Sequence, residues 1–221
     1  MGKQRPGWGF DHVAFLVAVL MAAILTACSS SLIPTTSPPS PPASGDLIWP
    51  VPGNPMELTV KAGLQPENKE TLAFHVHAHL DVLIEGRPIM VPPGIGINVM
   101  DTAVKHGKWN GQPTFGGIAG CLQPCISPLH THYASGVIHT ESGSSTPHRL
   151  GQLFTEWDVP LTDTCIGQYC RPATSIVVYV DGQRYSGRVA DITLTDRKEI
   201  AIIIGSAPKE IPSSFPSWAI G

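Results

Sequence analysis

The stretch that decides the fold is Phe74-His75-Val76-His77-Ala78-His79-Leu80-Asp81-Val82-Leu83-Ile84, and Glu85-Gly86 is predicted to form a turn after it. Apolar residues alternate with polar ones along most of this stretch, which is the pattern of a β-strand with one buried face. The even-numbered apolar residues would form the core face, so His75, His77, His79 and Asp81 would line the opposite face. The sequence therefore predicts that the three histidines do not pack the core of this sheet.

A second group of histidines lies in residues 129–141, with the sequence LHTHYASGVIHTE. This segment predicts two short strands around a polar loop at residues 133–136, with His130 opposite His139. Directly opposed Cβ atoms lie about 4.5–5.5 Å apart, so two imidazoles can reach one ion at nitrogen–metal distances of about 2.0–2.1 Å. The segment thus predicts an open three-histidine site on a polar face that holds His130, His132, His139 and Glu141.

Strand geometry limits how the first group of histidines can share an ion. His75 and His79 would be separated by about 13 Å at about 3.3 Å per residue. One or two histidines of that group would therefore join the second group, giving one buried ion or two neighbouring ions. Imidazole-rich sites suit copper and zinc, and intrinsic affinity favours copper. The predicted metal ligands are His75, His77, His79, His130, His132 and His139.

Two interpretations without a metal remain open. The histidines would be the polar face of a half-buried strand, or pairs that hydrogen-bond carboxylates. Six of the eight histidines after residue 28 lie in the two short segments, and this clustering favours a metal site. His106 and His148 stand alone in polar surroundings and are expected on the surface.

The chain resembles an uncharacterised family of exported bacterial and archaeal proteins that share three motifs. The motifs are an HxHxHL strand, here residues 75–80, an Ile-Gly-Ile segment, here residues 95–97, and an LHTHxxxGxIHxE hairpin, here residues 129–141. The resemblance covers residues 74–205 and implies no established activity. Many members carry Asp at the position of Tyr133, so a catalytic role for that carboxylate does not transfer to this chain.

The N-terminal residues 1–27 are predicted to be a lipoprotein signal peptide. Lys3 and Arg5 form a basic region, and residues 13–25 form an apolar segment that is too short to span a bilayer. Leu25-Thr26-Ala27-Cys28 resembles a bacterial lipobox, which implies cleavage before Cys28 and lipidation of its sulfur. The alternative is an ordinary secretory signal. The expected location is extracytoplasmic, with a lipid anchor in the cell membrane or the outer membrane.

Residues 28–55 are predicted to be the lipidated cysteine and a linker. Residues 29–45 are almost entirely Ser, Thr, Pro and Ala, a composition typical of a disordered stalk with extended polyproline structure. At about 3.1 Å per residue, the stalk would hold the folded part about 50 Å from the lipid surface. The folded metal-binding domain is expected at residues 56–221.

Four cysteines remain after Cys28, and an even number in an exported chain indicates disulfides. They are Cys121, Cys125, Cys165 and Cys170, for which three pairings are possible. The alternative is that Cys121 and Cys125 are thiolate ligands or a redox pair, because their spacing resembles that of Sco-type copper chaperones. The rest of the sequence does not resemble a thioredoxin fold.

The remaining pattern predicts a strand-rich scaffold. Ser145 or Thr146 would cap a helix with Pro147 at its first position. Residues 175–180 and 183–189 would form a hairpin around Asp181-Gly182, with further strands near residues 192–194 and 199–204. The predicted fold class is α+β, mainly β: one antiparallel, strand-rich domain, either sandwich-like or hairpins plus one short helix.

Several function classes lack support in the sequence. The net charge is −3 and no basic run is present, so no nucleic-acid partner is expected. No phosphate-binding glycine loop, serine elbow or HExxH helix occurs, so no nucleotide is expected and the common hydrolase motifs are missing.

Three functions remain open. The first is binding of copper or zinc for sequestration or for delivery to a membrane protein. The second is a metalloenzyme with an open water position, in which Glu141 or Asp81 acts as the base or orients a ligand. The third is a structural lipoprotein that binds a protein partner.

Overall fold

The computed structural model describes residues 47–219. The predicted signal peptide, the lipidation site Cys28 and most of the predicted linker lie outside the described residues. None of the helices within residues 47–219 is both long and apolar enough to cross a membrane.

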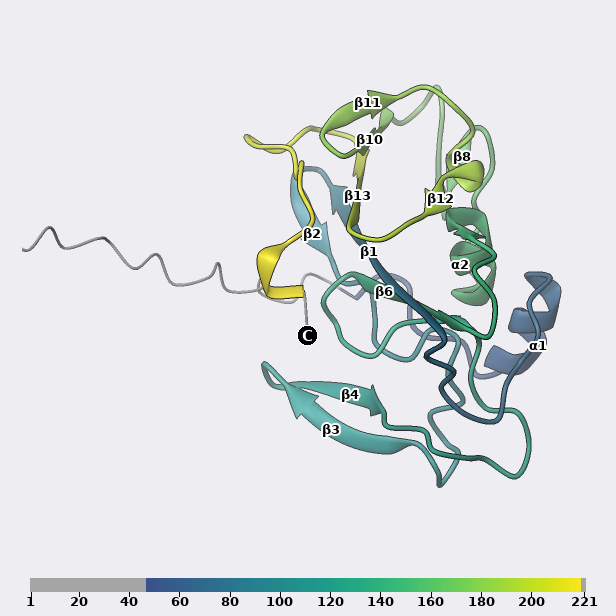
Figure 1. Ribbon diagram of the computed structural model, residues 1–221. Coiled ribbons are helices and arrows are strands. Elements are labelled where there is room, and N and C mark those ends of the chain that lie inside the picture. The colour runs from purple at the N-terminus through teal and green to yellow at the C-terminus, as the bar shows by residue number, and fades with distance from the viewer. Residues whose placement is uncertain (1–46, 220–221) are drawn as a thin grey trace, which may run out of the picture. The chain divides into compact units, whose positions relative to one another are not determined.

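The described residues form short helices and many strands (Figure 1). The α-helices are α1 (Pro55–Lys61) and α2 (Leu150–Glu156), and the 3-10 helices are η1 (Val189–Asp191) and η2 (Ser217–Ala219). The strands are β1 (Phe74–Ile84), β2 (Arg87–Ile89), β3 (Lys105–Trp109), β4 (Gln112–Gly116), β5 (Leu129–His130), β6 (Val137–Ser142), β7 (His148–Arg149), β8 (Cys165–Ile166), β9 (Tyr169–Cys170), β10 (Ile176–Val180), β11 (Gln183–Tyr185), β12 (Thr193–Leu194) and β13 (Lys198–Ile204).

The largest sheet is built around β1. Its strand order is β11-β10-β13-β1-β6-β5, and β2 also pairs with β1. β1 runs antiparallel to β6 and β2 but parallel to β13. The predicted α+β class with mainly β structure is confirmed, and the parallel pair is its one departure from an antiparallel sheet. A parallel neighbour requires a long connection, and β13 lies more than a hundred residues after β1.

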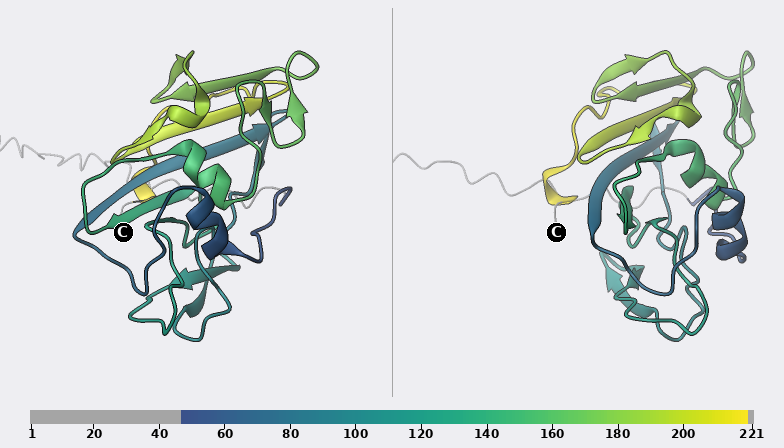
Figure 2. Two further views of the ribbon diagram at one scale, coloured as in Figure 1. Left: turned by 90° about the vertical axis from the view of Figure 1, so that its right-hand side faces the viewer. Right: turned by 45° about the vertical axis from the view of Figure 1, so that its right-hand side comes forward.

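The main core lies between this sheet and α2. Ala78, Leu80, Val82 and Ile84 of β1 pack in one buried cluster with Leu150, Leu153, Phe154 and Trp157, which confirms the predicted core face of β1. Figure 2 shows α2 lying against one face of the sheet. Burial of each large side chain contributes about 1.5–3 kcal/mol, so this interface fixes the direction in which the other face of β1 points.

Trp49 also belongs to this core, although it lies within the segment expected to be a linker. Its ring packs edge-on against Trp157 at a centroid distance of 5.6 Å, and its carbonyl accepts a hydrogen bond from the Trp157 indole. The indole of Trp49 donates to Gln168. Residues that precede position 56 therefore contribute directly to the packed structure.

The helix prediction was only partly right. The structure has two α-helices rather than one, and α2 begins at Leu150 with Arg149 as its N-cap, not at Ser145 or Thr146. The residues just before α2 form β7, which pairs with β12. This strand pairing takes up the backbone that the sequence pattern had assigned to the first helical turn.

Three hairpins turn at residue pairs that suit a two-residue loop. The predicted turns Glu85-Gly86 and Asp181-Gly182 have both residues at positive φ, as a type I′ turn requires. Asn110-Gly111 forms the same kind of turn between β3 and β4, a hairpin that the sequence analysis did not predict. Asn-Gly between extended segments is the sequence signal that indicates such a hairpin.

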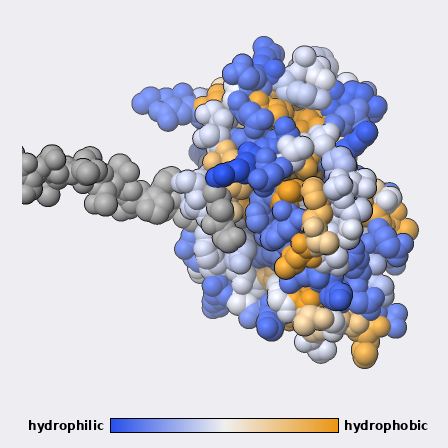
Figure 3. All heavy atoms as spheres, viewed as in Figure 1, coloured by the Kyte–Doolittle hydropathy of each residue, from blue (hydrophilic) through white to orange (hydrophobic). Residues whose placement is uncertain are grey.

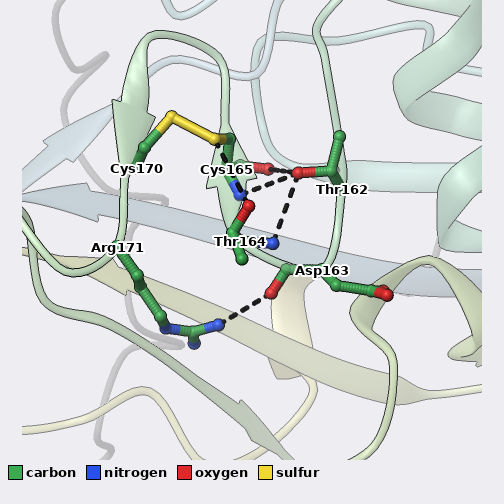
Figure 4. The surroundings of a disulfide bond; sticks show 6 residues. All are labelled: Thr162, Asp163, Thr164, Cys165, Cys170 and Arg171. Carbon is green, nitrogen blue, oxygen red and sulfur yellow. Dashed lines mark hydrogen bonds between the residues drawn. A yellow bond between two sulfur atoms is a disulfide. The ribbon is translucent and has the colours of Figure 1, made fainter.

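Both disulfides join cysteines that are close in sequence, Cys121 to Cys125 and Cys165 to Cys170. The predicted disulfides are confirmed, and the alternative of free thiolates at Cys121 and Cys125 is not supported. Figure 4 shows that the Thr162 hydroxyl accepts hydrogen bonds from the backbone of Thr164 and Cys165 beside the second disulfide. The Cys165–Cys170 disulfide closes a small loop outside the strands that carry the histidines.

Replacing both Cys165 and Cys170 by serine is expected to lower the free energy of unfolding by about 2 kcal/mol, the value for a short closed loop. Any metal that the predicted histidine ligands bind should be retained, because these cysteines lie on β8 and β9, which form a separate two-stranded sheet. Denaturant unfolding and elemental analysis of the double variant check both statements. A loss of metal relative to the wild type would contradict this expectation.

Candidate metal centre

Three neighbouring strands place most of the predicted ligands on one face of the sheet. β6 lies between β1 and β5, and its His139 is paired with His77 on one side and with His130 on the other. The predicted pairing of His130 with His139 is thereby confirmed. His75 is paired with Glu141 one step farther along. The alternating pattern of the strands therefore gathers imidazoles from distant parts of the chain.

The side chains converge on Glu141. Its Oε1 lies 3.2 Å from His75 Nε2 and 3.3 Å from His139 Nδ1, with His130 Nε2 at 3.8 Å and His132 Nε2 at 3.9 Å. His77 Nε2 lies 3.1 Å from His139 Nδ1. We refer to His75, His77, His130, His132, His139 and Glu141 as the histidine cluster.

His130 and His132 are held with their Nε2 atoms facing each other. His130 Nδ1 donates to the carbonyl of Ser127 at 2.8 Å, and His132 Nδ1 donates to the carbonyl of Phe115 at 2.5 Å. A neutral imidazole that donates from Nδ1 carries a lone pair on Nε2. The two Nε2 atoms are 3.1 Å apart. Two ligands of a tetrahedral ion with bonds of about 2.0–2.1 Å lie about 3.3 Å apart, so this pair has the spacing of ligands on one ion.

Burial controls the protonation of the cluster. It lowers the pKa of His130 well below its usual value, an effect to which His132 and His139 add. Burial also lowers the pKa of His139 to about 4, although Glu141 opposes the shift. Burial alone would raise the pKa of Glu141, but His132 and His139 outweigh it and the pKa falls. At neutral pH His130 and His139 are therefore neutral imidazoles and Glu141 is a carboxylate, which are the forms that bind metal ions.

Two atoms of the cluster are buried without a hydrogen-bond partner among the described residues. They are His139 Nε2 and Glu141 Oε2. A buried polar atom without a partner costs about 1–3 kcal/mol. Such a cost is unusual in a folded protein and is offset where the atom contacts an ion.

His79 and Asp81 are not brought into the cluster. His79 Nδ1 lies 3.0 Å from Glu199 Oε2 and 3.6 Å from Asp81 Oδ2, and its Nε2 is 2.9 Å from the carbonyl of Ser135. Both predicted roles, His79 as a ligand of the shared site and Asp81 as its base, are therefore placed at a second location. Glu199 is a buried site residue that the sequence analysis missed, because only the β1–β13 pairing brings it to His79.

The His79–Glu199 contact is a buried ionisable pair. Burial acts to lower the pKa of His79, but Glu199 and Asp81 outweigh it and raise the pKa. Burial raises the pKa of Glu199 to about 7, with His79 acting in the opposite direction. The donor atoms of His79, Asp81 and Glu199 all lie within 4.8 Å of one another, so this second group could also hold a metal ion, apart from the histidine cluster.

Two cavities reach the histidine cluster. One, of about 290 Å³, is lined by His75, His77 and His139 together with Trp109, Tyr133 and Trp218. The other, of about 420 Å³, is lined in part by His132, Glu141 and Lys105. Trp109 stands at the end of β3 and Trp218 in η2, with ring centroids 6.0 Å apart. Neither tryptophan could be identified from the sequence, since no periodic pattern links them to the histidines.

The two isolated histidines differ from each other. His106 is exposed, as predicted, and its Nε2 lies 2.8 Å from the carbonyl of Val99. His148 was expected on the surface but is buried in β7, and burial lowers its pKa. Pairing of β7 with β12 draws this residue inward.

The face drawn in Figure 3 shows hydrophobic residues in small groups among hydrophilic ones. Large exposed apolar residues of residues 47–219, such as Val60, Met100 and Leu122, lie in separate segments. Single exposed apolar residues are ordinary on a protein surface.

No protein-family model matches the chain, and no curated protein or solved structure matches it either.

Proposed function

We propose that this protein binds a transition-metal ion through the histidine cluster, outside the cytoplasm, for sequestration or delivery. The observation that carries the proposal is the pair of facing Nε2 atoms on His130 and His132, 3.1 Å apart. Each ring is oriented by a backbone carbonyl behind it, which is the arrangement usual for histidine ligands of metals. Without a cation between them, two buried lone pairs at this distance would repel.

The donor set supports copper first and zinc second. Neutral imidazoles suit both ions, and intrinsic affinity rises to a maximum at Cu(II). Calcium and magnesium prefer oxygen ligands, and the cluster offers one carboxylate among its nitrogens. The four cysteines of the described residues are paired in disulfides, so thiolates do not add to this set.

The N-terminal sequence supports a location at the membrane surface. The Leu25-Thr26-Ala27-Cys28 motif and the Pro-rich segment after it would tether the metal-binding part to a lipid anchor. We infer a membrane protein as the recipient of delivered metal, since the tether restricts the chain to that surface.

A metalloenzyme is the second candidate, and the cavity of about 290 Å³ favours it. The cavity joins three histidines of the cluster to three aromatic side chains, and cavities of about 300 Å³ and above accommodate small molecules. A bound ion would supply water of lowered pKa. The chain's own contribution would be an apolar wall for a substrate, with the carboxylate of Glu141 3.3 Å from His139, one of the histidines that line the cavity.

Elemental analysis of the full chain, purified untagged from its envelope compartment, tests the proposal. We expect near-stoichiometric copper or zinc in the wild type and its loss in a His130→Ala/His132→Ala variant. The matched control is His106→Ala, which removes an exposed histidine outside the cluster and should retain the metal. Circular dichroism of the metal-free proteins shows whether the double variant still folds.

Two outcomes decide between the candidates. If the wild type holds no metal, and binds none more tightly than the double variant, metal binding is rejected. If metal is bound, turnover of hydrolytic or redox substrates that disappears with Trp109→Ala, while metal content stays constant, would favour the enzyme over sequestration or delivery.

A further inference from the structure

The donor atoms of the histidine cluster form two sets. His130, His132, His139 and Glu141 offer donor atoms that all lie within 4.8 Å of one another, and so do His75, His77 and His139. The donors of His75 and His77 do not fall into one set with those of His130 and His132. His139 is the member common to both sets.

Ring positions repeat this division. The centroids of His130 and His132 are 4.6 Å apart, and those of His75 and His77 are 4.5 Å apart. His139 lies between the pairs, with centroid distances of 4.4 Å to His132 and 4.4 Å to His77. Opposite ligands of a six-coordinate ion with bonds of about 2.0–2.1 Å are about 4.1 Å apart. Because the donor atoms of the five rings do not all lie within 4.8 Å of one another, one ion does not readily use all of them.

Glu141 has the position of a bridging ligand. Its Oε1 lies 3.2 Å from His75 of one set and 3.8 and 3.9 Å from His130 and His132 of the other, and its Oε2 is buried without a partner among residues 47–219. Carboxylates commonly bridge two ions that lie about 3.5–4 Å apart. The Nε2 of His139 is likewise buried without a hydrogen-bond partner among the described residues.

We propose that the histidine cluster binds two transition-metal ions side by side, one at His130 and His132 and one at His75 and His77, with Glu141 and His139 between them. This inference rests on the proposed metal binding and adds the number of ions and their relative affinities.

The two positions differ in how firmly their ligands are held. His130 is fully buried, and the rings of His130 and His132 are both hydrogen-bonded to backbone carbonyls. His75 is exposed and His77 half-buried, and within the described residues neither ring has a backbone carbonyl partner. Metal binding would have to order the His75 and His77 side chains, which costs side-chain entropy. The ion at His75 and His77 therefore binds more weakly and exchanges first. A weakly held ion at the cavity is the one available for delivery.

Calorimetric titration of the metal-free full chain with Cu(II) tests this inference. We expect about two equivalents in the wild type, with the second bound at least tenfold more weakly, and about one equivalent in a His75→Ala/His77→Ala variant. Both substitutions lie on the accessible side of the cluster, and thermal unfolding of the metal-free variant checks that it folds. His106→Ala should keep both equivalents.

Electron paramagnetic resonance gives an independent readout. Two Cu(II) ions at bridging distance couple magnetically, so the doubly loaded wild type should show less uncoupled signal per copper than the His75→Ala/His77→Ala variant. One equivalent in the wild type would overturn the two-ion inference and leave metal binding intact. Two equivalents that both persist in the His75→Ala/His77→Ala variant would also overturn it. Absence of binding would reject both proposals.

Discussion

Replacing Gly96 by alanine is expected to lower the free energy of unfolding by about 3 kcal/mol or more and to weaken the proposed metal binding. Gly96 has φ of +71°, a conformation that costs a residue with a side chain about 1–2 kcal/mol. A Cβ at this position would also overlap the carbonyl oxygen of Leu129 and lie 3.2 Å from the Cβ of His130. The backbone that carries His130 would have to move.

Gly111→Ala is the matched control for this substitution. Gly111 has a similar φ of +78°, but nothing lies within 4 Å of the position its Cβ would take. Its replacement should therefore cost only the conformational strain, about 1 kcal/mol. Denaturant unfolding of both variants and their metal affinities give the comparison. Equal losses of stability in the two variants would contradict the close packing of Gly96 against β5.

Stability should decrease as pH rises through the neutral range because of Glu156. This side chain is buried at the end of α2, where Thr59 donates a hydrogen bond to its Oε1 at 2.8 Å. Burial raises its pKa to about 8, while Ser127 and Thr59 act to lower it. The folded state therefore keeps a proton that the unfolded state releases above its own pKa of about 4.5.

The sign of this pH dependence of stability follows from proton linkage. Between the unfolded pKa and the folded pKa, the folded state binds more protons, so each unit of rising pH costs about 1.4 kcal/mol. The stabilising contribution is fully present below about pH 4.5 and is lost as pH rises to about 8. From about pH 5 to about pH 7.5, the loss due to Glu156 should be about 3 kcal/mol.

Glu156→Gln removes this ionisable group and should make the free energy of unfolding less dependent on pH. Urea unfolding of the metal-free chain at several pH values should show the variant gaining on the wild type as pH rises. Glu210→Gln, at an exposed glutamate, is the control and should follow the wild-type curve. Parallel curves for wild type and Glu156→Gln would show that Glu156 is ionised in the folded state.

The local features of this fold could be read from the sequence. Alternation along residues 74–84 identified the core face of β1, and Asp-Gly and Glu-Gly pairs identified two hairpins. The facing of His130 and His139 followed from one short loop. Each of these features depends on residues that are near one another in the chain.

The features that depend on distant residues could not be predicted. Nothing in the sequence near Glu199 indicates that it pairs with His79, since a parallel register has no connecting turn to fix it. The cavity needs Trp109 from a hairpin and Trp218 from the far end of the chain. The start of α2 was misplaced because a local capping pattern competed with strand pairing, and the pairing prevailed.

The edge strand β5 is only two residues long, yet one histidine of the cluster stands in it and another lies just beyond it. So short a strand has few ladder hydrogen bonds to keep it from fraying, whereas an ion held jointly with β6 would act as a cross-link. Ligand linkage makes this quantitative: free metal at about a hundred times its dissociation constant adds about 2.7 kcal/mol to the folded state. If the proposed ion binds there, the stability of this sheet edge depends on the concentration of free metal. Loss of the metal would then favour local unfolding of β5.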